Sequence, residues 1–244
     1  MIMNSKIVGV NILIVGGQGQ YLGPALIQFN EDGSVRFEEC GTEKYKGRSF
    51  AVSEFLENNF VICGGMENTD CNVIDESGSQ SFDMAANGRI WAASVKLNQS
   101  TMWITGGVDS EYEILKSSEF VTIKGSTKGP NLLYPIQTHC IVQYKPNGFL
   151  LIGGDTGYGI TKRIWIIEQK NEFNITEGPY LNYGRTLPSC GTVKDEFENV
   201  LIIVAGGGED SIEILNTTTM TKWITGKTLI YAKILIVKSI MHYS

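Results

Sequence analysis

The chain has 244 residues, 42% of them hydrophobic and 19% charged, which is enough for one large domain or two ordinary ones with a sizeable core. Its formal net charge of -6 argues against a nucleic-acid partner, because nucleic-acid binding needs clustered cations. No apolar run reaches the roughly 18 residues of a membrane span, so no membrane partner is predicted. Glycine is abundant (28 residues) and proline scarce (6), which indicates many turns in an ordered protein.

A short apolar run that ends in Gly-Gly recurs five times along the chain. The first glycines of successive pairs lie 48, 42, 47 and 53 residues apart, which favours one repeat array over two unrelated domains. We expect these doublet glycines to end strands at places where positive φ and close backbone approach exclude a side chain. The ten doublet glycines are Gly16, Gly17, Gly64, Gly65, Gly106, Gly107, Gly153, Gly154, Gly206 and Gly207.

The sequence of each repeat unit predicts four short strands, which are separated by clusters of Asn, Gly, Asp and Ser. In the second unit these strands are expected at 49–56, 60–63, 72–75 and 80–84. Glu113-Ile114-Leu115 and Glu213-Ile214-Leu215 each begin six residues after a doublet, which predicts equivalent strands in two units. Residues 1–244 are thus predicted to form a single domain. Its units are expected at 1–40, 41–86, 87–125, 132–178 and 183–226, with an extra strand at 228–240.

Four antiparallel strands of this length cannot bury both faces of a sheet alone, so each sheet must pack against its neighbours. Radial stacking of such sheets at this period predicts an all-β propeller. Beyond the doublets, some units place an aromatic residue near their end and an arginine at the start of the inner strand. The aromatic position holds Phe37, Phe82 and Trp223, with Ile123 and Ile175 in its place in two units, and the arginine position holds Arg48, Arg89 and Arg185.

In these features the repeats resemble the kelch family. The resemblance covers nearly the whole chain and implies a kelch-type β-propeller of about five four-stranded blades plus a partial sixth. Two interpretations of the end of the array stay open. Either the segment 228–240 pairs with the N-terminal region and closes a ring, or the chain is a truncated piece of a larger kelch protein. Truncation is favoured, because a one-stranded sixth blade would expose unpaired edges.

The five cysteines form no C-x-x-C pair, and their odd number and scattered spacing favour reduced thiols in a cytoplasmic protein. The N-terminal residues lack the features of a signal peptide. A disulfide between Cys63 and Cys71 would form if the chain is secreted, so a secreted protein or ectodomain fragment remains an alternative. N-x-S/T sequons occur at Asn98, Asn174 and Asn216, but about two would arise by chance and they do not by themselves indicate secretion.

Histidine is scarce, with only His139 and His242 in the chain. A histidine-based metal centre or a Ser-His-Asp triad would depend on His139 alone, and a lone histidine on an apolar strand is more often a core residue. The kelch-type copper oxidases need two histidines, and sialidase-type propellers need sequence boxes that this chain lacks. No catalytic residue, metal or cofactor is predicted. A propeller enzyme of oxidase or glycosidase type remains the weaker alternative.

The loop after each doublet and the connection into the next unit are expected at the same end of the sheets. Acidic loops around a few guanidinium groups would recognise a protein or peptide of mixed charge, and the kelch resemblance also implies a protein partner. The alternative is that the arginines tie blades together by bonding backbone carbonyls. The sequence thus predicts a non-catalytic interaction module, monomeric unless its incomplete blade pairs with another chain. The candidate partner-binding residues are Arg48, Arg89, Arg185, Tyr21, Asp70, Asp109, Asp155, Tyr158 and Asp210.

Overall fold

The computed structural model describes residues 11–14, 25–29, 34–39, 48–66, 68–75, 78–86 and 88–226. These residues form only strands and turns, and no helix that could cross a membrane occurs among them. The predictions made for Gly16, Gly17, Tyr21 and the segment 228–240 lie outside the described residues, so the two interpretations of the end of the array stay open.

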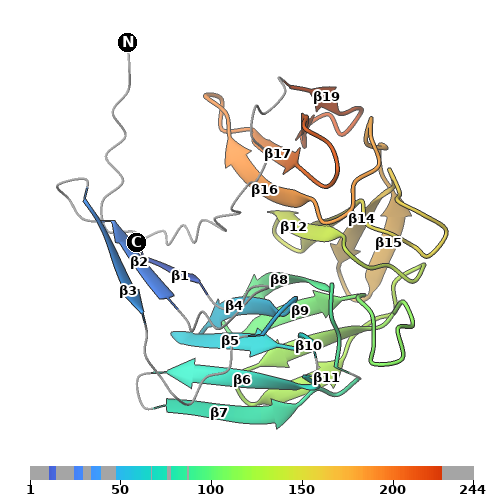
Figure 1. Ribbon diagram of the computed structural model, residues 1–244. Coiled ribbons are helices and arrows are strands. Elements are labelled where there is room, and N and C mark those ends of the chain that lie inside the picture. The colour runs from blue at the N-terminus through green and yellow to red at the C-terminus, as the bar shows by residue number, and fades with distance from the viewer. Residues whose placement is uncertain are drawn as a thin grey trace.

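The strands form antiparallel sheets that follow one another along the chain, and the all-β prediction is confirmed (Figure 1). Blade one holds β1 (Asn11–Ile14), β2 (Ala25–Phe29) and β3 (Val35–Glu39). Blade two holds β4 (Val52–Leu56), β5 (Asn59–Cys63), β6 (Asp70–Asp75) and β7 (Gly78–Asp83). Blade three holds β8 (Ala93–Asn98), β9 (Thr101–Thr105), β10 (Ser118–Thr122) and β11 (Gly125–Lys128). Blade four holds β12 (Cys140–Lys145), β13 (Gly148–Ile152), β14 (Ile164–Gln169) and β15 (Phe173–Glu177), and blade five holds β16 (Ser189–Lys194), β17 (Val200–Ala205), β18 (Ile212–Asn216) and β19 (Ile224–Thr225).

Blades two to five contact one another in chain order through their first strands, β4, β8, β12 and β16. Figure 1 shows these blades fanning out with the first strands on the inside. Each hydrophobic cluster is built from two neighbouring blades: Val61 with Ile104, Trp103 with Phe149, and Leu150 with Ile202. A blade therefore completes its core only against the next blade, as repeat architectures require.

The third blade corrects two sequence predictions. Its last strand ends at Lys128, beyond the predicted boundary at 125. The segment Glu113-Ile114-Leu115 is not a strand equivalent to Glu213-Ile214-Leu215. It lies in the loop after the doublet, where Ile114 forms only an isolated bridge to Val108, and the third strand of the blade starts at Ser118. A longer loop in this blade shifts the strand away from the spacing that the sequence suggested.

Four of the five cysteines are paired, so the prediction of reduced thiols is wrong for these four. Cys63 and Cys71 lie opposite each other on β5 and β6 with their Cα atoms 4.0 Å apart, and they form a disulfide. A second disulfide, which the sequence did not predict, joins Cys140 of β12 to Cys190 of β16. Both residues stand at the start of inner strands in consecutive units, and that shared position is the signal that could have identified the pair.

Candidate binding face

The doublets of blades two to five lie at one end of the sheets, called the doublet end below. The eight described doublet glycines all have positive φ, for example 64° at Gly64 and 100° at Gly65. The second glycine donates its N–H to a carbonyl of the next blade: Gly65 to Arg89 at 2.9 Å and Gly154 to Arg185 at 2.7 Å. A Cβ at Gly154 would lie only 2.6 Å from the Gln137 carbonyl oxygen. The doublets of blades two to four are therefore joints between blades, where a side chain has no room, whereas a Cβ at Gly206 of blade five would meet no atom within 4 Å.

The three inner arginines face the interior of their blades rather than solvent. Each stands four residues before its inner strand, and their exposed fractions are 5% for Arg48, 2% for Arg89 and 0% for Arg185. Each guanidinium donates to the carbonyl of the first doublet glycine of its own blade, at 3.2 Å to Gly64 in blade two and 2.6 Å to Gly206 in blade five.

Carboxylates in the same blade accept from further guanidinium donors of these arginines, while the buried Nε of Arg89 has no hydrogen-bond partner among the described residues. Arg89 pairs with Glu119 at 2.7 Å and Arg185 with Glu213 at 3.1 Å, and all four side chains are fully buried. Burial lowers the pKa of Arg89, while the ion pair with Glu119 opposes that change. The sequence predicted that these arginines contact a partner, with guanidinium bonds between blades as the alternative. Their guanidinium groups are instead buried and bond within their own blades.

Blade four replaces this ion pair by an apolar pair. The residue four positions before β12 is Ile136, and Trp165 is the second residue of β14, the place that Glu119 and Glu213 hold in β10 and β18. Ile136 still accepts a hydrogen bond from the Gly107 N–H at 2.8 Å, so the backbone joint is kept. At these two positions blade four therefore has hydrophobic side chains where blades three and five have buried charges.

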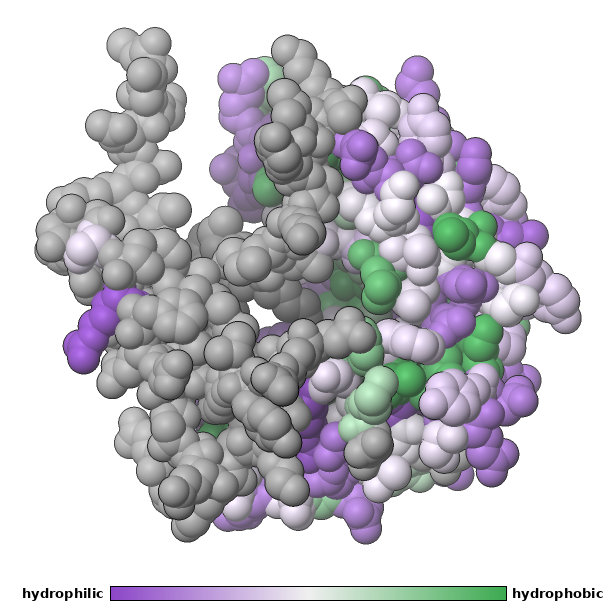
Figure 2. Space-filling model, viewed as in Figure 1, coloured by the Kyte–Doolittle hydropathy of each residue, from purple (hydrophilic) through white to green (hydrophobic). Residues whose placement is uncertain are grey.

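A groove of about 520 Å³ opens at this end of blade four. Three tyrosines line it with half or more of their surface exposed: Tyr134 at 50%, Tyr158 at 102% and Tyr180 at 51%. Figure 2, viewed as Figure 1, shows hydrophobic side chains scattered among hydrophilic ones on the described surface. They do not merge into one large hydrophobic patch in this view. Large exposed aromatic rings around one groove are typical of recognition surfaces.

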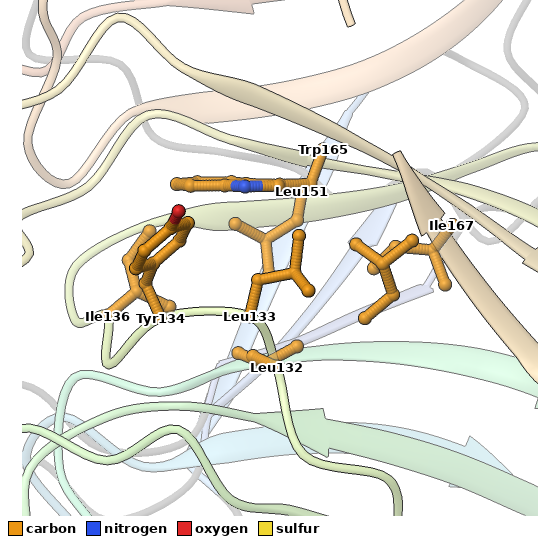
Figure 3. Close-up of a pocket in the computed structure, with 8 residues that line it drawn as sticks. Leu132, Leu133, Tyr134, Ile136, Leu151, Trp165 and Ile167 are labelled. Carbon is orange, nitrogen blue, oxygen red and sulfur yellow. The ribbon is translucent and has the colours of Figure 1, made fainter. Parts of the chain in front are cut away.

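The floor of the groove continues into the core. Beneath it lies an apolar cavity of about 10 Å³, and both Tyr134 and Trp165 line the cavity and the groove. Figure 3 shows the indole of Trp165 lying across this cavity from Leu132, with Tyr134 and Ile136 on one side. The cavity is too small for more than about one water molecule, so the groove rests on a packed floor.

Two cations line the same groove, Lys162 and Arg163, and they are the only charged residues among its described lining residues. Arg163 lies over the Tyr134 ring at 5.8 Å from its centroid and pairs with Glu177 at 3.4 Å, with nearly half of its side chain exposed. Tyr180 donates its hydroxyl to Glu177 at 2.6 Å, and this hydrogen bond raises the pKa of Tyr180. The groove thus offers flat aromatic surfaces beside accessible positive charge.

The other predicted partner-binding residues are spread around the doublet end. Asp70 pairs with Arg48 at 2.9 Å, and Asp109 and Asp155 accept backbone N–H groups of their own loops, from Glu111 at 2.9 Å and Gly157 at 2.8 Å. The carboxylates of Asp109 and Asp155 thus organise their loops, whereas that of Asp70 holds the inner arginine of blade two. Asp210 is exposed, and Tyr158 is the one predicted residue that lines the groove.

His139 lies outside the groove and is 5% exposed. Its Nε2 lies 2.9 Å from the Thr105 hydroxyl, and burial lowers the pKa of His139 to about 3. The imidazole is therefore neutral at physiological pH, in keeping with its interpretation as a core residue. Among the described residues, no three His, Cys, Asp or Glu side chains are grouped closely enough to hold a metal ion.

His139 gives a testable pH dependence. Between its unfolded value of 6.5 and its folded value near 3, the unfolded chain binds a proton that the folded protein does not, so stability falls as the pH drops. We expect the free energy of unfolding to fall by about 2 kcal/mol from neutral pH to about pH 5 on account of this group. Urea denaturation across this range checks it, and His139→Gln should show a flatter profile. Parallel profiles for the two proteins would contradict the prediction.

No protein-family model and no curated protein matches the sequence. Among solved structures, that of YjhT matches with a TM-score of 0.74 at 13% identity, over 91% of this chain and 83% of the other. A fungal alcohol oxidase of the AA5 family, solved with copper, matches with a TM-score of 0.57 at 12% identity; the match covers 90% of this chain and 63% of the oxidase. At such identities the matches establish the fold alone. With the four-stranded blades, they identify the chain as a β-propeller.

Proposed function

We propose that this chain is a kelch-type, non-catalytic propeller that binds an extended protein segment in the groove of blade four. The observation that carries the proposal is the set of three exposed tyrosines around that groove. Tyrosine supplies a large contact area with few side-chain torsions to immobilise, which makes it effective in interfaces. The kelch assignment is supported by the doublets and by the arginine positions of blades two, three and five.

The charge of the groove defines the chemistry of the segment. Lys162 and Arg163 line the groove of a protein whose formal net charge is -6. Glu177 pairs with Arg163, so the positive charge of Lys162 gives the groove a sign opposite to that of the chain as a whole. A segment with an acidic side chain next to apolar or aromatic residues complements this arrangement: its carboxylate meets the cations and its apolar residues lie on the tyrosine rings. The partner is thus proposed to present an acidic, extended stretch of chain.

Selection of displayed random 12-residue peptides on the purified protein tests this function. We expect the selected peptides to carry Asp or Glu beside apolar residues and to bind at least about tenfold more weakly to Tyr158→Ala/Tyr180→Ala, because both rings are exposed contact surface. Fluorescence anisotropy of a labelled selected peptide measures the affinity. Raising the salt concentration should also weaken binding.

The matched control is Phe197→Ala. Phe197 is 75% exposed but lies in the turn between β16 and β17, at the other end of the sheets. This variant should bind the peptide like the wild type, and none of the variants should melt earlier. Equal binding to the double tyrosine variant would place the site elsewhere. Stoichiometric copper in the purified protein, or turnover of a substrate, would contradict the non-catalytic part of the proposal.

A further inference from the structure

The disulfides bear on the compartment in which the protein works. Two pairs, Cys63–Cys71 and Cys140–Cys190, connect strands within one blade and between two blades. Structural disulfides persist in oxidising compartments and are rare in the cytosol. The disulfides therefore favour the secreted or ectodomain alternative over a cytoplasmic location. In eukaryotic cells, a chain that passes through the secretory pathway also meets the machinery that glycosylates N-x-S/T sequons.

All three sequons lie at the end of the blades opposite the doublets. Asn98 is the last residue of β8, Asn216 is the last residue of β18, and Asn174 is the second residue of β15, after the turn from β14. In each blade the first and third strands run away from the doublet end, so these positions share the far end. The groove and the sequons thus occupy opposite ends of the propeller.

The local geometry leaves the amide nitrogens of the three asparagines outside the hydrogen bonds of the described residues. Asn98 and Asn174 are exposed, and Asn216 is half-buried. In two sequons the asparagine Oδ1 accepts the backbone N–H of the hydroxyl residue two positions later, Ser100 at 2.9 Å and Thr218 at 2.8 Å. Within the described part of the chain no hydrogen bond uses the Nδ2 of any of the three asparagines. A glycan added before folding can therefore remain in place without displacing any internal contact of that nitrogen.

We propose that Asn98, Asn174 and Asn216 are N-glycosylation acceptors, whose glycans cover the end of the propeller opposite the groove. In the transfer, Nδ2 forms a bond to the anomeric carbon of an oligosaccharide carried on a polyprenyl diphosphate. The bond from that carbon to the diphosphate oxygen breaks, the lipid diphosphate leaves, and a proton is lost from Nδ2. No oxidant or reductant is needed. The glycan at Asn174 would also shield β15, an outer edge strand that could otherwise pair with another chain.

The test uses the protein purified from its native source. A thiol-reactive label applied before reduction should modify none of the four described cysteines. Treatment with peptide N-glycosidase should reduce the mass of the chain in steps. Peptide mass spectrometry should find Asn converted to Asp at each of the three positions. Free thiols at the four cysteines, or unmodified asparagine at all three sequons, would overturn the proposal. An unmodified asparagine at one sequon excludes that residue alone.

A pair of substitutions separates loss of the sequon from loss of structure. Thr176→Ala removes the hydroxyl that the sequon at Asn174 requires, whereas Thr176→Ser keeps it, and the exposed Thr176 side chain is not part of the core. When the wild type and both variants are expressed in one type of cell, the alanine variant should lack one glycan that the wild type carries. The serine variant should retain that glycan. Loss of one glycan from both variants, or from neither, would contradict the assignment of Asn174.

Discussion

Arg89→Met is expected to lower the free energy of unfolding by about 3 to 5 kcal/mol. The substitution leaves the Glu119 carboxylate without its partner, and both side chains are fully buried. It also removes the donors to the carbonyl oxygens of Gly106, at 2.9 Å, and Ser117, at 3.1 Å. Unpaired polar groups in the interior lose their hydration without compensation. Urea denaturation of the purified variant measures the effect.

Two control variants test whether the loss of stability in Arg89→Met comes from the buried, unpaired carboxylate of Glu119. In Arg89→Met/Glu119→Leu the buried charge is gone, so we expect at least about half of the loss to be recovered. Arg163→Met removes an arginine whose side chain is nearly half exposed, and its stability should change by no more than about 0.5 kcal/mol. Wild-type stability in Arg89→Met, together with lost peptide binding, would instead support the original prediction of a partner-binding arginine.

Loss of the disulfide between Cys140 and Cys190 is expected to cost about 4 kcal/mol, as measured with Cys140→Ala/Cys190→Ala. The crosslink spans 50 residues and joins the inner strands of blades four and five, so it restricts the unfolded chain strongly. The same bond holds blade five beside the blade that carries the groove. Unfolding in urea at equal protein concentration gives the comparison with the wild type.

The shorter disulfide is the matched control. Cys63 and Cys71 are only 8 residues apart, so Cys63→Ala/Cys71→Ala should cost less, about 2.5 kcal/mol from loop closure. A reductant should destabilise the wild type and both double variants, but each variant by less than the wild type. If the reductant leaves the wild type unchanged, or if the Cys140 and Cys190 variant is as stable as the wild type, the bond between blades does not contribute as proposed.

Much of the fold was predictable because the repeats are local patterns. An apolar run before each doublet predicted a strand, and in blade two the predicted 60–63 corresponds to β5 at Asn59–Cys63. The strand after the doublet was harder to place, since loop length varies between blades. Glu113 has the spacing of Glu213, but the residue that pairs with the inner arginine is Glu119, six positions later.

The candidate site was less predictable. Tyr158 was identified from its place in a loop after a doublet, but Tyr134 and Tyr180 come from the connections between blades and carried no signal of their own. Their proximity depends on how blade four packs against its neighbours. The sequence did not single out Trp165 either, because only alignment of the strands in space shows that it stands where blades three and five have a buried glutamate.

The sequence by itself determined the period of the repeat and the all-β class, because both depend on patterns within a few residues of the chain. The doublet glycines gave a local signal too, but a carbonyl from a distant segment is what excludes a side chain there, as Arg89 does at Gly64. Only the tertiary structure decided the partners of Arg89, Cys140 and Tyr134, because these residues act through groups that lie on another strand or another blade. Packing buried the inner arginines, which the sequence predicted to contact a partner, together with their carboxylates. It also brought Tyr134 and Tyr180 beside Tyr158, so that three tyrosines stand exposed around the groove.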